Sequence, residues 1–334
     1  MNDELKHTIS KASQVFILTD ENVAPFWLPE LEYWLGCENA IEIVIRSGEQ
    51  YKNLQTVQRI WKTLMKHHAD RNALLINLGG GTITDLGGFA ASTYKRGIRF
   101  INVPTTLLAM VDAAIGGKTG IDFGGAKNQI GTFAQAEEVL IDPVFLTTLS
   151  QREILSGMVE MLKYGFVADS KLLNVNLENY YQFIDQCGEI KRDIVAQDPR
   201  ERGLRKILNF GHTLGHAIES YCLAKASPLL HGEAVALGME AALWISVKQC
   251  GLVEKVLLDY EEKLPVLLSE AEIYLSETDV DPIMANLVHD KKNRCEIPQF
   301  VLLEEVGKPV WDVEVKRELV RQSVAFTIYK VSNG

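Results

Sequence analysis

The stretch LINLGGGTITDLGGFAAS, residues 75–92, decides how the first half of the chain folds. An aliphatic run leads into three consecutive glycines, and a predicted helix follows. Glycine lets the backbone turn sharply and approach a phosphate, and the amino end of a helix favours negative charge. This order is typical of a nucleotide-binding α/β unit, although the GxGxxG fingerprint is absent. A tight turn without a ligand remains the alternative.

Similar aliphatic runs recur on both sides of this stretch. Between two of them, residues 54–70 have helical spacing, and Asn53 precedes them as a plausible N-cap. Alternating strands and helices predict an α/β, Rossmann-like domain spanning residues 1–150. The runs predicted as buried parallel strands are residues 15–20, 41–45, 73–78, 100–103 and 139–142.

The pattern changes near residue 151, which predicts a mostly α-helical second domain over residues 151–334. An extended segment is expected at 299–308, and a last helix near 313–326. The remaining helices are predicted at residues 151–168, 170–186, 187–198, 205–223, 232–251 and 254–268.

The composition narrows the possible partners and compartments. A net charge of −10 over 334 residues argues against a general nucleic-acid binder. The five cysteines are scattered without CxxC spacing, which suits a reducing cytoplasm better than a disulfide framework or a thiolate zinc site. The polar amino terminus and the lack of a long apolar run predict neither a signal peptide nor a membrane span. A cytoplasmic protein with small-molecule partners is expected.

Two further stretches contain charged residues among glycines or apolar residues, where charged side chains are uncommon. The glycine-rich residues 103–131, expected to be flexible, contain Lys118 and Lys127 and could bind an anion or form a solvated loop. In residues 156–165, Glu160 and Lys163 lie three apart on one predicted helical face. Glu160 could therefore bind a metal or simply pair with Lys163.

The segment NFGHTLGHAIES, residues 209–220, places His212 and His216 four residues apart. Within the predicted helix 205–223, Arg205 and Asn209 fall on the same stripe. His231 comes immediately before another predicted helix. Two or three histidines with one glutamate make a plausible catalytic zinc set, and a pair of core histidines is the alternative.

Six motifs occur here in the order and spacing found in 3-dehydroquinate synthases: GGGTITDLGGFAAS, VPTTLLAMVDAAIGGKTG, GAKN, VEMLKYG, NFGHTLGHAIE and LLHGEA. The chain resembles that family over nearly its whole length. The resemblance implies a homodimeric, NAD- and metal-dependent lyase, with zinc the most common metal and cobalt possible. Its members convert 3-deoxy-D-arabino-heptulosonate 7-phosphate to 3-dehydroquinate and phosphate in the shikimate pathway. The steps are transient oxidation by NAD, phosphate elimination, reduction and an internal aldol closure.

The resemblance also implies roles for individual residues around the metal and substrate. Glu160, His212 and His231 would bind the metal, whereas His216 would face the substrate phosphate. Arg96 would reach the active site of the partner subunit. In DKKN (290–293), Lys292 is preferred over Lys291 as a substrate contact. The other positions that match substrate contacts are Asp112, Lys118, Asn128, Lys163, Lys191, Arg205 and Asn209.

A second set of positions matches the contacts that this family makes with NAD. Three residues depart from the family's usual pattern: Thr84 and Ala114 on the cofactor side, and Asp122 near the substrate loop. The matching cofactor positions are Asp20, Asn22, Glu49, Lys52, Gly80, Gly81, Asp85, Thr105, Thr106, Leu108, Lys127, Phe145, Thr148, Leu149 and Glu153.

Three other functions compete with this interpretation. A related sugar-phosphate cyclase would share the metal set and act on sedoheptulose 7-phosphate or glucose 6-phosphate. A metal-dependent glycerol or alcohol dehydrogenase has a similar fold but little use for so many cations around one site. A non-catalytic sensor would not need both a metal set and an anion site.

Overall fold

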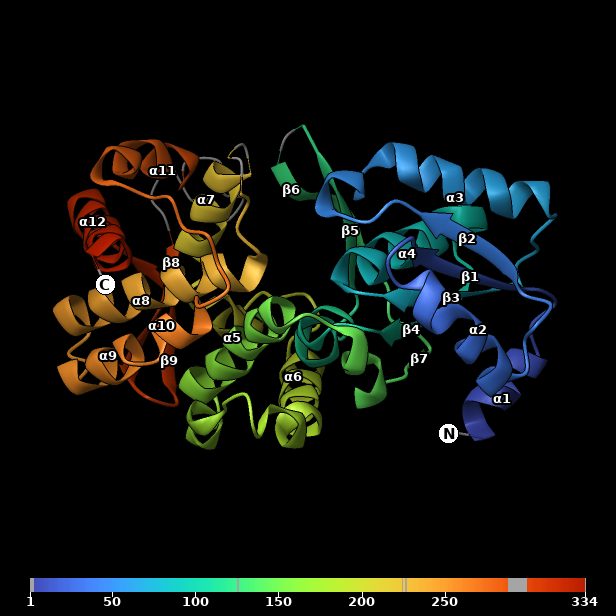
Figure 1. The fold of residues 1–334 in the computed structure, drawn as a ribbon, viewed down its shortest axis with the longest axis horizontal. Coiled ribbons are helices and arrows are strands. Elements are labelled where there is room, and N and C mark those ends of the chain that lie inside the picture. Colours follow the sequence, from blue (N-terminus) through green and yellow to red (C-terminus); the bar gives the residue numbers. More distant parts are fainter. Residues whose placement is uncertain (1–2, 125, 224, 226, 288–298, 334) are drawn as a thin grey trace. The chain divides into compact units, whose positions relative to one another are not determined.

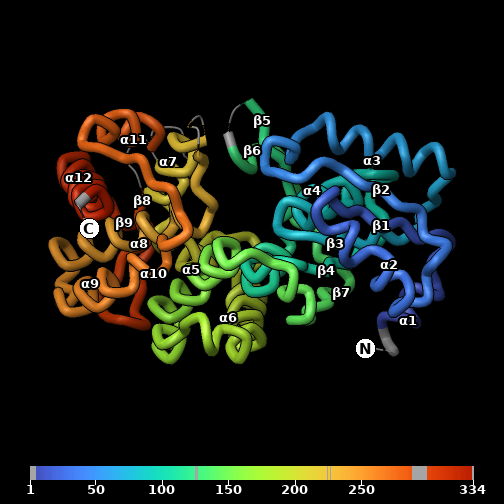
Figure 2. Tube along the Cα trace, in the orientation of Figure 1, coloured from blue at the N-terminus to red at the C-terminus, as the bar shows by residue number. Residues whose placement is uncertain are grey.

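The computed structural model describes residues 3–124, 126–223, 225, 227–287 and 299–333 (Figures 1 and 2). The chain divides into two compact units, residues 1–149 and 150–334. The first is an α/β unit and the second is mostly helical, so the predicted fold class is confirmed. In the described part of the chain, none of the helices combines the length and apolar character needed to cross a bilayer.

The first unit is built on a five-stranded parallel sheet with the strand order β2-β1-β3-β4-β7. The predicted strands are confirmed, although the fifth shrinks to two residues. The strands are β1 (Val15–Asp20), β2 (Ile41–Ile45), β3 (Leu74–Gly79), β4 (Arg99–Pro104) and β7 (Glu138–Val139). The helices are α1 (Asp3–Ser10), α2 (Ala24–Leu35), α3 (Leu54–Lys66) and α4 (Gly81–Thr93).

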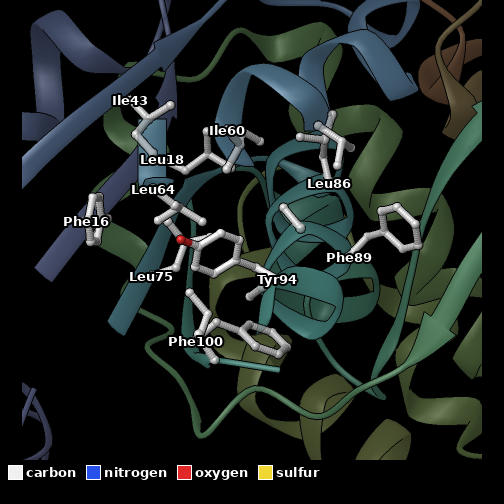
Figure 3. Packing of buried hydrophobic residues seen from close by; sticks show 14 of the residues in the cluster. Phe16, Leu18, Ile43, Ile60, Leu64, Leu75, Leu86, Phe89, Tyr94 and Phe100 are labelled. Carbon is white, nitrogen blue, oxygen red and sulfur yellow. The ribbon is translucent and has the colours of Figure 1, made fainter. Parts of the chain in front are cut away.

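The core of this unit lies between the sheet and helices α3 and α4. Figure 3 shows Leu18 of β1 beside Ile60 and Leu64 of α3, and Leu86 of α4 belongs to the same cluster. The predicted cap of α3 is present, because the Asn53 side chain accepts a hydrogen bond from the Thr56 amide at 3.1 Å. Burial of the apolar side chains in this core supplies most of the stability of such a unit.

The glycine-rich stretch after β4 is more ordered than its composition predicts. After a π-helical turn, η3 (Ala109–Ala113), strands β5 (Lys118–Phe123) and β6 (Ala126–Phe133) form an antiparallel hairpin. A side chain at Gly131 would place Cβ 2.3 Å from the Thr119 carbonyl oxygen. This glycine therefore permits close strand pairing rather than flexibility.

The second unit is organised around one buried helix, α8 (His231–Gln249), which packs against α5, α7, α9 and α12. Figure 2 follows the chain through this unit from green to red. The other helices are α5 (Gln151–Val167), α6 (Ile184–Gln197), α7 (His212–Cys222), α9 (Glu254–Glu261), α10 (Leu264–Leu267), α11 (Val280–Asn286) and α12 (Arg317–Asn333). Strands β8 (Gln299–Glu305) and β9 (Lys308–Glu314) form a hairpin, so the last helix begins later than predicted.

Two helical predictions are wrong. Where a helix is predicted at 170–186, the structure has two short 3₁₀ turns, η5 (Ser170–Asn174) and η6 (Tyr180–Phe183), and only the last three residues belong to α6. Between the turns, the side chains of Asn176 and Asn179 accept hydrogen bonds from nearby backbone amides. The predicted helix 205–223 breaks at Gly211, whose φ is +77°.

The break at Gly211 separates residues that had been placed on one helical stripe. A Cβ at this position would lie 2.4 Å from Met239 Cγ on α8, so both the backbone angle and the space require glycine. Arg205 and Asn209 belong to a separate 3₁₀ turn, η7 (Leu204–Asn209), while His212 and His216 share α7.

Candidate metal centre and cofactor site

Glu160 lies in the middle of α5 and is fully buried. Burying a carboxylate is costly unless a cation or hydrogen-bond donors compensate for it. Lys163, three residues later, forms an ion pair with Glu160 and is itself almost fully buried. Burial acts to raise the pKa of Glu160, but Lys163 and then His212 outweigh it and hold that pKa well below its usual range.

Three imidazoles gather around this carboxylate. Glu160 Oε1 lies 3.4 Å from His212 Nε2 and 3.6 Å from His231 Nε2. His216 lies one turn after His212, and one ligand nitrogen from each of the three histidines falls within 4.8 Å of the others. Distance alone does not separate His216 from the other two, so its predicted role toward substrate stays a prediction.

Close helix packing holds these groups in register. The Gly232 amide donates to Ser156 Oγ at 3.1 Å, and a Cβ at Gly232 would lie 2.1 Å from the Ser156 carbonyl oxygen. Helices α5 and α8 therefore approach closely one residue beyond His231. On the other side, a Cβ at Gly215 of α7 would lie 3.0 Å from the Cα of Val235.

A half-buried ion pair fixes the first turn of α8 on α5. Arg152 donates to both oxygens of Glu233, at 2.6 and 2.8 Å. Glu233 also accepts from the Leu230 amide at 2.7 Å, which caps the helix that His231 begins.

The described residues fit a divalent metal. Neither oxygen of the Glu160 carboxylate accepts a hydrogen bond of ordinary geometry within the described part of the chain. His212 donates from Nδ1 to the Phe210 carbonyl oxygen at 3.0 Å, which leaves its Nε2 free to bind. Burial lowers the pKa of His212, so its neutral form is favoured. One carboxylate with two or three imidazoles is a typical catalytic zinc donor set.

Three other substrate positions predicted in the second unit belong to η7 and α6 rather than to α7. Arg205 is buried and donates to the Pro199 carbonyl oxygen at 3.0 Å. Asn209 donates to Glu201 Oε1 at 2.5 Å, and Lys191 lies buried on α6. Lys292 and the neighbouring Lys291 lie outside the described residues.

In the first unit, a polar cluster forms around the buried Lys52. Its Nζ lies 2.6 Å from Asp85 Oδ2, 2.8 Å from Asn128 Oδ1 and 3.7 Å from Glu49 Oε1. Lys127 Nζ is 3.5 Å from the same Glu49 oxygen. Burial would lower the pKa of Lys52, but Asp85 and Glu49 raise it above its ordinary value. Four predicted cofactor residues and one predicted substrate residue thus converge.

Asp122 shapes this cluster. The sequence had marked Asp122 only as a departure from the family pattern. Its carboxylate accepts a hydrogen bond from the Asn128 amide at 2.8 Å, and Asn128 has a φ of +51°. The Asp122 amide donates to the Lys52 carbonyl oxygen at 2.8 Å. Asp122 therefore stabilises an unfavourable backbone conformation at Asn128, and this conformation presents the side-chain oxygen of Asn128 to Lys52.

The glycine turn after β3 leaves its backbone accessible. Gly80 precedes α4 in an extended conformation with no side-chain cap, and a Cβ there would lie 3.0 Å from Thr106 Cγ2. At Gly81 a Cβ would lie 3.0 Å from Ala113 Cβ. Thr84 is buried and donates to the Gly81 carbonyl oxygen at 3.1 Å, and Ala114 is buried as well. The Thr84 hydroxyl is thus hydrogen-bonded, and Ala114 has no polar side-chain atom. Both departures from the family pattern therefore fit their buried positions.

The remaining predicted cofactor residues differ in what their side chains can do. Asp20 accepts from the amides of Asn22 and Val23, which forms the turn after β1. Phe145 is only 1% exposed and packs edge-on against Trp27, so its ring serves the core. Thr148 accepts from Trp27 Nε1 at 2.8 Å. Thr105, Thr106 and Leu108 follow β4, Leu149 ends the first unit, and Glu153 belongs to the second.

Three predicted substrate residues also lie in the first unit. Lys118 is exposed at the start of β5, and Asp112 lies in η3. Arg96 is exposed in the turn before β4 with a φ of +69°.

Comparison with known proteins identifies the family. The family models described as 3-dehydroquinate synthase N-terminal and C-terminal match residues 42–156 and 157–293. A 3-dehydroquinate synthase of Parabacteroides distasonis is 41% identical over 349 aligned positions, covering 100% of this chain and 97% of that protein.

Two solved structures share the fold closely. A 2-deoxy-scyllo-inosose synthase complexed with carbaglucose-6-phosphate, NAD⁺ and Co²⁺ gives a TM-score of 0.83 at 25% identity over 96% of this chain and 94% of that one. A 2-epi-5-epi-valiolone synthase from Streptomyces hygroscopicus with NAD⁺ and Zn²⁺ bound gives 0.82 at 26% identity, covering 96% and 92%. With both halves matched, this chain belongs to the 3-dehydroquinate synthase family.

Proposed function

We propose that this chain is a 3-dehydroquinate synthase, which converts 3-deoxy-D-arabino-heptulosonate 7-phosphate to 3-dehydroquinate and phosphate. The observation that carries this proposal is the convergence of Glu160, His212 and His231 from three helices of a chain related to such enzymes along its full length. The buried carboxylate and the imidazole nitrogens offer what a catalytic divalent metal needs.

Glu160, His212 and His231 would hold that metal, for which both Co²⁺ and Zn²⁺ have precedents in the related structures. When bound, a divalent cation lowers the pKa of a substrate hydroxyl and stabilises developing negative charge. Lys163 lies beside Glu160, where it offsets the negative charge of the ligand and of the substrate. His216, one turn after His212, would donate a hydrogen bond to the substrate phosphate.

NAD is the second group that we assign, on the strength of both related structures. When bound, it would supply reversible hydride transfer. Glu49, Lys52, Asp85 and Lys127 would contact it, together with the open backbone of Gly80 and Gly81. A glycine turn at a helix start suits the pyrophosphate.

Buried lysine and arginine side chains in an acidic chain fit an anionic substrate. The substrate carries a carboxylate and a phosphate, yet the chain has a net charge of −10. In the second unit, Lys191 and Arg205 would bind anionic groups of the substrate and help to hold one substrate conformer, which lowers the entropic part of the barrier. A homodimer in which Arg96 reaches the partner's active site, and a cytoplasmic location, complete the proposal.

A product assay tests this function. The purified protein, NAD and zinc would be mixed with the heptulosonate phosphate, with phosphate, NADH and carbocycle followed together. Phosphate and dehydroquinate in equal amounts, without net NADH, are expected.

Other outcomes point to the alternatives. Activity on sedoheptulose 7-phosphate or glucose 6-phosphate alone would indicate a related cyclase. Steady accumulation of NADH with simple alcohols would indicate a dehydrogenase, and absence of turnover with all of them would contradict the proposal.

A further inference from the structure

Glu219 lies on the same face of α7 as two of the clustered histidines. It follows His212 by seven residues and His216 by three, which places all three side chains on one helical stripe. Glu219 is only 2% exposed. A carboxylate this deeply buried requires a specific reason, because burial strongly disfavours its charged form.

The Glu219 carboxylate faces His231 across the interface of α7 and α8. Its Oε2 lies 3.4 Å from His231 Nδ1, while His231 Nε2 lies 3.6 Å from Glu160 Oε1. One imidazole is thus held between two carboxylates, one at each ring nitrogen. If Nδ1 carries a proton shared with Glu219, the Nε2 lone pair points toward Glu160 and its neighbours.

The corresponding partner of His212 is different. His212 Nδ1 donates to the Phe210 carbonyl oxygen at 3.0 Å, which is neutral. A carboxylate partner withdraws the Nδ1 proton more strongly than a carbonyl does and so makes Nε2 a better electron donor. The two imidazoles therefore differ in basicity as well as in position.

We propose that Glu219 is a positioning residue that orients His231 and strengthens its Nε2 as a ligand of the metal. This inference rests on the proposed metal centre. The competing interpretation is an ordinary buried ion pair that only joins α7 to α8. The two differ in whether loss of the Glu219 charge changes the metal site or only the stability of the fold.

The substitution Glu219→Gln separates them, because an amide oxygen still accepts a hydrogen bond from Nδ1 but carries no charge. We expect zinc affinity, measured by competition with a chromophoric chelator, to fall by about 10- to 100-fold. The visible absorption bands of the Co²⁺ protein should shift as well. Glu219→Asp, which keeps the charge, should recover part of the affinity.

Glu240→Gln is the matched control, because Glu240 is also a fully buried carboxylate of this unit, located on α8. It should leave zinc affinity and the Co²⁺ bands unchanged. The proposal is overturned if Glu219→Gln binds zinc within about twofold of the wild type with the same Co²⁺ bands. If that variant does not fold, Glu219→Asp decides, because a purely structural role predicts normal zinc affinity in whatever fraction is folded.

The wild-type zinc titration separates this inference from the proposed function. If the wild type fails to bind zinc, the metal centre itself is wrong, and the role of Glu219 is overturned with it. If the wild type binds zinc and the Glu219 variants match it, only the positioning role is lost.

Discussion

Two regions of the helical unit each bury a carboxylate completely, yet their surroundings are opposite. Glu160 on α5 faces Lys163, His212 and His231, whereas Glu240 on α8 lies near Thr327 of α12 and the ring of Tyr260 on α9. In the described part of the chain, neither carboxylate accepts a hydrogen bond of ordinary geometry. Burial raises the pKa of Glu240 to about 8, while the pKa of Glu160 is held well below its usual range.

The difference shows that a buried carboxylate does not by itself indicate a metal site. Around Glu160, nitrogen donors and a cation keep the oxygens charged, as a metal ligand must be. Around Glu240, the neutral acid is the favoured form, because little compensates for the lost hydration. Imidazole nitrogens within reach therefore distinguish the candidate ligand from the core acid.

The largest effect is expected from the histidines of α7. His212→Ala should lower zinc affinity by more than about 100-fold and abolish turnover, because a direct ligand matters more than its supporting residues. His216→Ala should keep zinc and lose turnover through weaker binding of the substrate phosphate. Zinc titrations and product assays on both variants measure this. Equal loss of zinc in the two would make His216 a ligand.

The packing that supports Glu160 can be broken without touching a ligand. Gly232→Ala would push a Cβ to within 2.1 Å of the Ser156 carbonyl oxygen, so α5 and α8 must separate. We expect a loss of about 3 kcal/mol in unfolding free energy, together with weaker zinc binding. Gly215→Ala is the milder variant, because its Cβ would lie 3.0 Å from the nearest atom, and it should lower the unfolding free energy by less. Equal urea midpoints for both would contradict the packing argument.

The buried cation Lys52 can be compared with the two buried carboxylates. It pairs with Asp85 and Glu49 of its own unit. Lys52→Met should remove the buried cation 2.6 Å from Asp85 Oδ2, lowering unfolding free energy by about 3 kcal/mol. NAD affinity should fall and zinc affinity should not change. Calorimetric titration with NAD and urea denaturation measure the two effects, and Lys62→Met on the exposed face of α3 is the control. NAD affinity equal to wild type would remove Lys52 from the cofactor site.

The sequence predicted the sheet well because short aliphatic runs bounded by turns leave few alternatives. The first two strands begin and end where their runs do, as at Val15 and Ile41. The helix break at Gly211 was missed because its cause, the close approach of Met239, lies 28 positions further along the chain. Helical spacing reports which residues could share a face, and only tertiary packing decides whether the helix continues.

The candidate sites were predictable to different degrees. Glu160, His212 and His231 were assigned through family motifs, and the structure brings them within reach of one another. The contacts of Lys52 with Asp85 and Asn128 span 33 and 76 positions, so no local pattern could have paired them. Glu219 was overlooked, although its place seven residues after His212 on the same predicted helix was visible in the sequence.

A further effect is expected at Glu240, and it depends on pH. Because its pKa is raised from an ordinary value of 4.5 to about 8, the folded state keeps a proton that the unfolded state has lost between these values. Stability should therefore fall as pH rises through this window, by at most about 1.4 kcal/mol per pH unit. Glu261 on α9 acts in the same direction, whereas Lys330 on α12 opposes it.

The variant Glu240→Gln isolates this contribution, since a neutral amide has no proton to lose. Urea unfolding in the presence of a metal chelator should show the variant more stable than wild type at pH 9, with the advantage shrinking toward pH 5. An advantage independent of pH would mean that Glu240 is ionised in the folded protein at neutral pH. In that case the surroundings of Glu240 would favour a charged carboxylate, as those of Glu160 do. The two carboxylates would then differ only in the imidazole nitrogens that lie near Glu160 and that the described residues do not place near Glu240.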